Sequence, residues 1–219
     1  MQGHKDPAPS TRIGWLHTVL EQRNCKRVLD TVCGDGGDSL ALVEAGLEMV
    51  SCDNSDSSLR KVMTLRWKKR SQPGFDIWVI AKAKPSTLEY DLGQEGVVLG
   101  AGFDAVLCLK DTFTTLNQED MRAAISNMAT LLRKGGVMVI DQLEGDTDLE
   151  AGTDQLASDM DHTAVKPRSS SARPLTLEGF EKLLKTCFVG GYTHTLYAQH
   201  ESAAEEGKPF KFYHVIDKL

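Results

Sequence analysis

Short apolar runs alternate with helical patterns along most of this chain, and that alternation limits the fold more than any other feature. The runs contain β-branched residues and leucine, and each is too short to be a helix. They span residues 26–31, 47–52, 75–80, 103–109 and 137–141. Because strands covered on both faces are continuously apolar, five such runs separated by helices predict a parallel sheet between two helix layers.

The intervening segments have helical spacing, and the last third of the chain changes character. Helices are predicted at 10–23, at 38–46, in a segment whose apolar face is Leu59, Val62, Met63 and Trp67, near 121–132, and at 177–188. Period-two alternation at 191–198 and 210–217 predicts an antiparallel hairpin. The fold class is therefore α/β: a doubly wound, mainly parallel, seven-stranded, Rossmann-like sheet with a C-terminal antiparallel hairpin. The polar stretch at about 143–173 is interpreted as a loop or a much reduced insertion in one domain spanning 1–219.

Composition narrows the class of partner. The 219 residues include 25 basic and 31 acidic side chains, a formal net charge of −6. Nucleic-acid binding draws largely on Lys and Arg contacts to phosphates, so a small molecule is expected and nucleic acid is not. No apolar run approaches the ~20 residues needed to span a bilayer, and the first ten residues lack a signal-peptide core, so a cytoplasmic protein without membrane association is expected. The five cysteines form no C-x-x-C pair, so reduced thiols and no metal site are expected.

The end of the first predicted strand carries the clearest candidate site. In an open parallel sheet, ligands bind beyond the carboxyl ends of the strands. There the sequence reads LDTVCGDGGD from Leu29, with Gly34 and Gly36 allowing a tight turn, and Asp53 closes the next strand. A carboxylate at that strand end is placed to accept hydrogen bonds from both ribose hydroxyls of an adenosine.

The turn differs from the dinucleotide fingerprint. G-x-G-x-x-G would need a third glycine where Ser39 stands. Three carboxylates, at Asp30, Asp35 and Asp38, would repel a pyrophosphate and would favour a ligand that carries an amino group. Adenosine attached to a sulfonium amino acid meets that description better than NAD does.

Longer segments carry a resemblance. VLDTVCGDGGDSLALVEAGLEMVSCDNSDSSL resembles the cofactor half of class I S-adenosylmethionine-dependent methyltransferases. RWKKRSQPGFDIWVI, GFDAVLCLKDTF, LLRKGGVMVID and FYHVIDKL are similar to segments of glycine N-methyltransferases. The resemblance covers about 14–142 and 174–219, and it implies the Rossmann-like methyltransferase fold, S-adenosylmethionine as cofactor, and a small-molecule amine as methyl acceptor. It leaves open whether the chain forms a homo-oligomer.

The resemblance also implies roles for particular positions. Val32 and Gly34 would line the methionine portion, Asp53 would hold the ribose, and Leu109 would lie beside the adenosine. Asp111 and Thr112 follow the fourth strand, where the family places the acceptor, and are the candidate catalytic residues. The complete set of candidate cofactor-binding residues is Asp30, Val32, Gly34, Gly36, Asp53, Asn54, Lys84 and Leu109.

Several positions depart from the family pattern. Lys110, Asp111 and Thr112 replace its Gly-Asn-Ser, and Lys84 and Pro85 replace its Asn-Trp near the adenine. Leu143 replaces its acceptor-binding arginine, and Lys110 or Arg173 could supply the missing cation. These departures support an alternative function, a relative that binds S-adenosylmethionine or S-adenosylhomocysteine without catalytic activity. A third class, an NAD-dependent oxidoreductase, would require dinucleotide binding.

Some of these residues also have purely structural interpretations. Asp53 could cap the helix that begins near Ser55, and Asp111 and Thr112 could simply begin a helix. His214 is predicted to be a core histidine, Cys33 a packing residue, and Trp67 and Trp78 core residues. The basic run 66–70 is expected to complement the negative end of a helix dipole.

Overall fold

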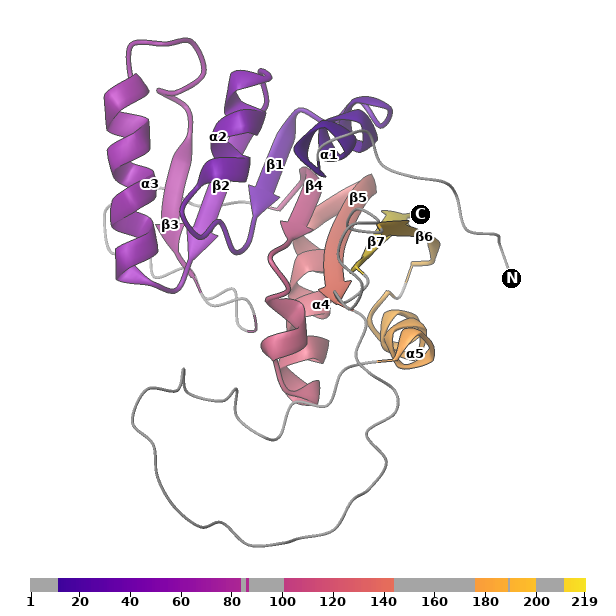
Figure 1. Cartoon of the computed structure of the whole chain (residues 1–219). Helices are drawn as coiled ribbons and strands as arrows, with labels where there is room; N and C mark the ends of the chain where they lie inside the picture. Colours follow the sequence, from indigo (N-terminus) through magenta and orange to yellow (C-terminus); the bar gives the residue numbers. More distant parts are fainter. Residues whose placement is uncertain (1–11, 84–85, 87–100, 144–175, 189, 200–210) are drawn as a thin grey trace, which may run out of the picture.

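A seven-stranded mixed sheet forms the centre of the molecule in the computed structural model (Figure 1). The structure describes residues 12–83, 86, 101–143, 176–188, 190–199 and 211–219. The strand order is β3-β2-β1-β4-β5-β7-β6, with β1 to β5 parallel and β7 antiparallel to both β5 and β6. The predicted doubly wound sheet with its C-terminal hairpin is confirmed.

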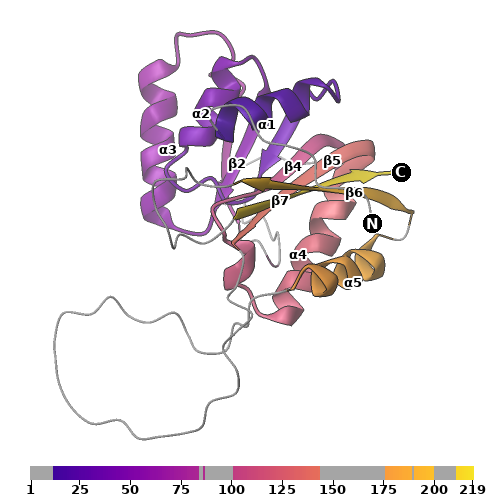
Figure 2. The same ribbon diagram turned by 45° about the vertical axis from the view of Figure 1, so that its right-hand side comes forward.

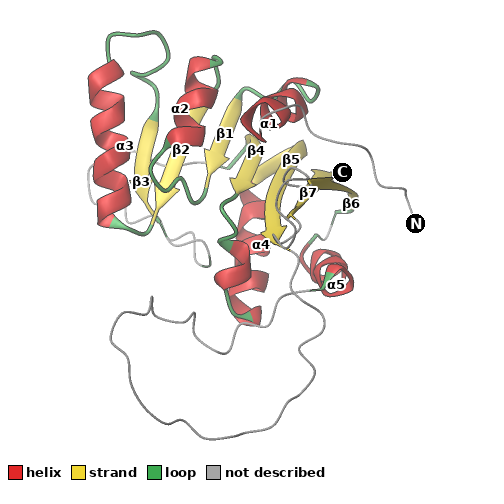
Figure 3. Ribbon diagram, in the orientation of Figure 1, coloured by secondary structure: helices red, strands yellow, loops and turns green. Residues whose placement is uncertain are grey.

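Among the described elements, helices and strands alternate from α1 to β3 and again from β4 to β6, and β7 then follows β6 (Figure 3). The strands are β1 (Arg27–Asp30), β2 (Glu48–Asp53), β3 (Val79–Lys82), β4 (Phe103–Cys108), β5 (Leu132–Leu143), β6 (Tyr192–Gln199) and β7 (Lys211–Lys218). The helices are α1 (Arg12–Glu21), α2 (Gly37–Glu44), α3 (Asp56–Lys69), α4 (Gln118–Leu131) and α5 (Leu177–Cys187), with a short 3₁₀ helix, η1 (Phe113–Thr115).

Alternate residues of the strands face two separate cores. Helices α1, α2 and α3 cover one face and α4 and α5 the other (Figure 2). In β5, Val137 and Val139 join the first core while Met138 and Ile140 join the second. Both faces of the sheet are therefore buried, which accounts for the continuous apolar runs in the sequence.

Local sequence explains where the helices begin. Ser55, Asn117 and Thr176 precede α3, α4 and α5 in extended conformation, and each side chain accepts a hydrogen bond from a backbone N–H of the first turn. These caps satisfy donors that a helix start leaves without partners. Basic residues fill the last turn of α3, as the helix-dipole interpretation predicts.

Three expectations about the first half of the chain were wrong in part. The third strand begins only at Val79, so 75–78 lies outside it, although Phe75 and Trp78 are buried. Trp67 is 66% exposed and Met63 59% exposed on α3, where Val62 alone is buried. Sequence periodicity predicted the helix correctly but not which of its faces is buried. The guanidinium of Arg70 lies over the Trp67 ring at 4.0 Å, a contact that favours an aromatic side chain at the surface.

Other expectations were confirmed or lie outside the described residues. His214, Cys33 and Trp78 are buried, and all five cysteines are free thiols. Lys84 and the stretch 144–173 fall outside the described residues. Within the described ranges, no helix is long and apolar enough to cross a membrane.

Candidate functional site

The turn after β1 lies where the direction of sheet construction reverses, between the neighbouring strands β1 and β4. Such switch points are where open α/β sheets bind ligands. Gly34 and Gly36 have φ of +57° and +81°, a conformation that side chains disfavour. A Cβ on Gly36 would lie 2.8 Å from Val62 Cγ2, so the turn can pack against α3 only with glycine there.

Asp53, at the end of β2, fastens this turn to the neighbouring strand. Its Oδ2 accepts the Gly34 N–H at 2.8 Å and its Oδ1 accepts the Ser55 N–H at 2.8 Å. The carboxylate thus points toward the turn, and it also holds the backbone of Ser55, the residue that caps α3. An ionised carboxylate has about four acceptor positions, so two remain for further donors.

Asp30 closes β1 and is fully enclosed. Its oxygens accept hydrogen bonds from the Ser39 hydroxyl at 2.8 Å and the Val32 N–H at 3.2 Å. Burial raises the pKa of Asp30 to about 6, against the lowering effect of these two bonds. Asp30 therefore organises the turn from beneath.

The loop after β4 has unusual backbone geometry. Lys110 and Asp111 are consecutive non-glycine residues with φ of +66° and +56°. Asp141 on β5 holds them, because its two oxygens accept the N–H groups of Lys110 and Asp111, each at 2.9 Å. Strained backbone of this kind persists only where the surroundings fix it, and it gathers at functional sites.

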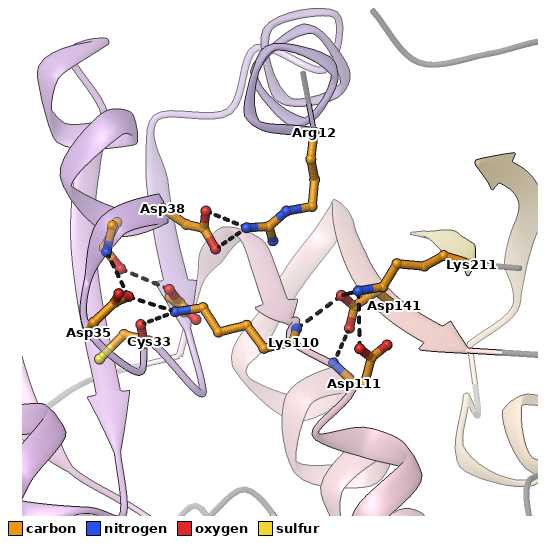
Figure 4. Close-up of polar contacts among 11 residues, drawn as sticks. Arg12, Cys33, Asp35, Asp38, Lys110, Asp111, Asp141 and Lys211 are labelled. Carbon is orange, nitrogen blue, oxygen red and sulfur yellow. Dashed lines mark hydrogen bonds and ion pairs between the residues drawn. The ribbon is translucent and has the colours of Figure 1, made fainter. Parts of the chain in front are cut away.

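The Lys110 side chain extends from this loop to the turn after β1 (Figure 4). Its Nζ donates to the Cys33 carbonyl at 2.8 Å and to Asp35 Oδ1 at 3.1 Å. The hydrogen bond from Lys110 lowers the pKa of Asp35. An ammonium group therefore lies directly over the glycine turn, and a Cβ on Gly34 would be only 2.7 Å from it.

A second charged group lies on the other side of the β4 loop. Lys211 Nζ is 3.1 Å from Asp111 Oδ2 and 3.1 Å from Asp141 Oδ2. Asp141 is fully buried, and burial raises its pKa despite the nearby Lys211. Although burial alone would lower the pKa of Lys211, the charges of Asp141 and Asp111 raise it. Asp111 Oδ1 is buried and accepts no hydrogen bond from the described residues.

The remaining candidate residues lie around these two groups. Val32 is half-buried and Leu109 buried, while Asn54 is exposed directly after Asp53. The carbonyls of Asp111 and Thr112 accept the N–H groups of Thr114 and Thr115, so both residues also begin η1, as the structural interpretation expects.

Three charged residues at the site were missed by sequence reasoning: Asp141, Lys211 and Arg12. Arg12 Nη2 binds both oxygens of Asp38, at 2.6 and 2.8 Å, and so satisfies one of the three turn carboxylates (Figure 4). Asp141 could have been found, since it closes a predicted strand. Arg12 and Lys211 carried no local signal.

Comparisons with known proteins agree with this architecture. A family model described as a methyltransferase domain matches residues 28–136. Glycine N-methyltransferase of Oryctolagus cuniculus is 43% identical over 143 residues, which are 63% of this chain and 48% of the relative. Glycine/sarcosine N-methyltransferase of Aphanothece halophytica is 31% identical, over 61% of this chain and 46% of the relative. The chain spans about half the length of the curated relatives it matches.

Solved structures share the fold at low sequence identity. The methyltransferase domain of bacterial CtHen1-C has a TM-score of 0.65 at 18% identity, covering 94% of this chain and 96% of that one. The glycopeptide N-methyltransferase MtfA, solved with sinefungin, has a TM-score of 0.61 at 12% identity, covering 97% and 88%. With the sheet order, the family model and the relatives in agreement, the chain has the fold of the S-adenosylmethionine-dependent methyltransferases and is similar in sequence to methyltransferase domains.

Proposed function

We propose that this chain binds S-adenosylmethionine over the turn after β1 and transfers its methyl group to the amine of a small molecule. The observation that carries the proposal is the ammonium group of Lys110 on the Cys33 carbonyl above Gly34. A site that accommodates one ammonium offers hydrogen-bond acceptors, the Cys33 carbonyl and the Asp35 carboxylate, which the amino group of the cofactor also needs. The residues present therefore fit this group, provided that Lys110 moves.

Each candidate residue has a definite task in this proposal. Asp53 accepts the ribose hydroxyls with its two remaining acceptor positions, while Gly34 and Gly36 let the ligand approach the backbone. Val32 and Leu109 supply apolar surface, and Asn54 directly follows Asp53. Lys84, outside the described residues, stays a cofactor-binding candidate through the family resemblance alone. Asp30 keeps the turn in place through Ser39.

The acceptor amine is assigned to the space beside Asp111 and Thr112. S-adenosylmethionine, when bound, supplies a methyl group on a positively charged sulfur. Asp111 Oδ1 is a buried acceptor with no partner among the described residues, so it suits an N–H of the incoming amine. Holding that N–H turns the nitrogen lone pair toward the reacting carbon, and such positioning supplies much of the catalysis that a transfer of this kind requires.

Lys211 sets the expected limits on the acceptor. The family's acceptor-binding arginine is replaced by Leu143, and Lys211 is the cation placed beside Asp111. An acceptor carboxylate, such as that of glycine, would have to compete with Asp111 and Asp141 for it. Glycine is therefore a testable acceptor, and amines without a carboxylate are equally suited.

A second candidate function rests on Lys110 itself. Because its ammonium already lies on the turn, a chain that binds the cofactor without turnover is the alternative. The test pairs calorimetry of S-adenosylhomocysteine with methylation assays on glycine, sarcosine and simple amines. Turnover that is lost in Asp111→Ala but kept in Asp76→Ala, an exposed position, supports the transferase. Cofactor binding without turnover on any amine supports the binding relative, and no binding rejects both.

A further inference from the structure

Lys110 makes contacts that a bound ligand would need for itself. Its Nζ donates to the Cys33 carbonyl at 2.8 Å and to Asp35 at 3.1 Å, and it lies 2.7 Å from the position of a Cβ on Gly34. The Lys110 amine therefore occupies the space above the turn that is open because residue 34 is a glycine. The side chain is 31% exposed, so its path to the turn is not enclosed by the core.

The backbone of the β4 loop aims the side chain there. Lys110 has φ of +66°, and its N–H is held by Asp141 at 2.9 Å. A left-handed conformation is disfavoured for an L-residue, and glycine would adopt it without that strain. The strained backbone disfavours this position of Lys110, whereas the two hydrogen bonds of its amine favour it. A ligand that supplies its own donors to the Cys33 carbonyl and to Asp35 can therefore displace the amine.

We propose that Lys110 is an internal competitor for the amino-acid end of S-adenosylmethionine: a latch that closes the turn after β1 until the cofactor's own ammonium displaces it. This inference rests on the proposed cofactor site and deepens it. Two ammonium groups do not both donate to the Cys33 carbonyl at 2.8 Å, because like charges that close repel each other. The nucleoside end is assigned to Asp53 on β2, which accepts hydrogen bonds from Gly34 and Ser55, while the Lys110 amine donates to Cys33 and Asp35.

The latch affects binding of the amino-acid end of the ligand and not binding of its nucleoside end. Apparent affinity falls in proportion to the fraction of molecules that are ready to bind. Ligands with an amino-acid tail therefore bind less well than the open site would allow. Ligands that lack the tail do not depend on whether the latch is open.

The experiment measures calorimetric affinity for two probes that share a nucleoside and a thioether. S-adenosylhomocysteine carries the amino-acid tail, and 5′-methylthioadenosine lacks it. The variants are Lys110→Ala and Lys110→Gly, and glycine at φ of +66° is expected to fold without strain. Lys69→Met is the matched control, because Lys69 also pairs with a carboxylate, that of Glu44, at the opposite end of α2 from the glycine turn. Circular dichroism checks that each variant is folded.

The expected result is tighter S-adenosylhomocysteine binding by both Lys110 variants, with unchanged 5′-methylthioadenosine binding. A gain of about tenfold would mean a latch that is closed roughly nine-tenths of the time. Unchanged or weaker S-adenosylhomocysteine binding overturns the latch, and the weaker result would instead assign Lys110 to the carboxylate of the tail. If no variant binds either probe, the proposed cofactor site fails, a result distinct from failure of the latch alone.

Discussion

Asp53 and Asp141 act alike at the scale of single residues. Asp53 is the last residue of β2 and Asp141 lies near the end of β5, and each uses both carboxylate oxygens to accept two backbone N–H groups from loops at the ligand-binding edge. Hydrogen bonds to charged acceptors are stronger than those between neutral groups. The two loops that meet under Lys110 are therefore fixed by carboxylates, while the Lys110 side chain is held by the hydrogen bonds of its amine to the Cys33 carbonyl and to Asp35.

Replacing Asp53 tests whether it serves the turn, the ligand or both. Asp53→Ala leaves the N–H groups of Gly34 and Ser55 without their acceptor, so the free energy of unfolding should fall by roughly 2–4 kcal/mol, at about 1–2 per hydrogen bond. Cofactor affinity should fall by a similar amount, about 2–4 kcal/mol, if two ribose hydroxyls bind there. Urea unfolding and calorimetry measure the two effects. Asp76→Ala, at an exposed position, should change neither. A stability loss with unchanged affinity would make Asp53 purely structural.

The backbone at position 110 allows a second test. Lys110→Gly and Lys110→Ala both remove the amine, so they differ only in their tolerance of φ +66°. The glycine variant should be more stable than the alanine variant by about 1 kcal/mol. Denaturant unfolding of the pair checks this, and equal stabilities would show that the loop relaxes to a right-handed conformation once the lysine is gone.

At the scale of elements, the buried His214 and the partly buried His194 join α5 to the hairpin of β6 and β7. His194 Nε2 lies 3.0 Å from His214 Nδ1, and the His214 ring stacks on Phe180 of α5 at 3.8 Å between centroids. Burial, reinforced by the neighbouring His194, lowers the pKa of His214 to about 3, and burial also lowers that of His194. Glu181, 3.8 Å from His194, acts in the opposite direction. The pair remains neutral in the folded protein at pH 7.

Acid should therefore weaken the packing of α5. Between pH 6.5 and about 3 the unfolded chain binds more protons than the folded one, so stability contributed by neutral His214 is full above pH 6.5 and is lost as the pH falls. From pH 7 to 5 the loss from His214 is roughly 2 kcal/mol. Asp30 has the opposite sign, because its raised pKa of about 6 adds stability as the pH falls through that value toward the ordinary range of an aspartate.

A difference measurement isolates the histidine from Asp30. His214→Leu should flatten the pH dependence of unfolding over pH 5–7 relative to the unchanged chain. Parallel slopes for His214→Leu and the unchanged chain would mean that His214 does not titrate as its burial implies.

The elements also show what sequence can and cannot predict. Strands β1, β2, β4 and β5 were predictable because burial on both faces makes them continuously apolar. The turn at Gly34 and the position of Asp53 followed from the strand ends. The Asp141–Lys211 contact did not, because it depends on the register that pairs Leu143 with Lys211 across a distant hairpin. The reach of Lys110 to Cys33 depends on a strained loop conformation that no local pattern encodes.

For the whole molecule, ligand-induced stabilisation distinguishes the function classes. A ligand that binds only the folded state raises its melting temperature. S-adenosylhomocysteine should raise the melting temperature of this chain, and NAD at the same concentration should leave it unchanged. Differential scanning fluorimetry measures both. A shift with NAD alone would favour the oxidoreductase that the turn sequence argues against.

The order of strands at one sheet edge has a consequence for synthesis. Among the described strands, β6 bonds only to β7, which lies between it and β5. When the ribosome has made β6 but not β7, no place in the nascent sheet is ready for it, and the edge of β5 is bare. Exposed strand edges invite pairing with other chains. The interval before β7 emerges is thus when a nascent chain of this protein is most open to aggregation and to chaperone capture.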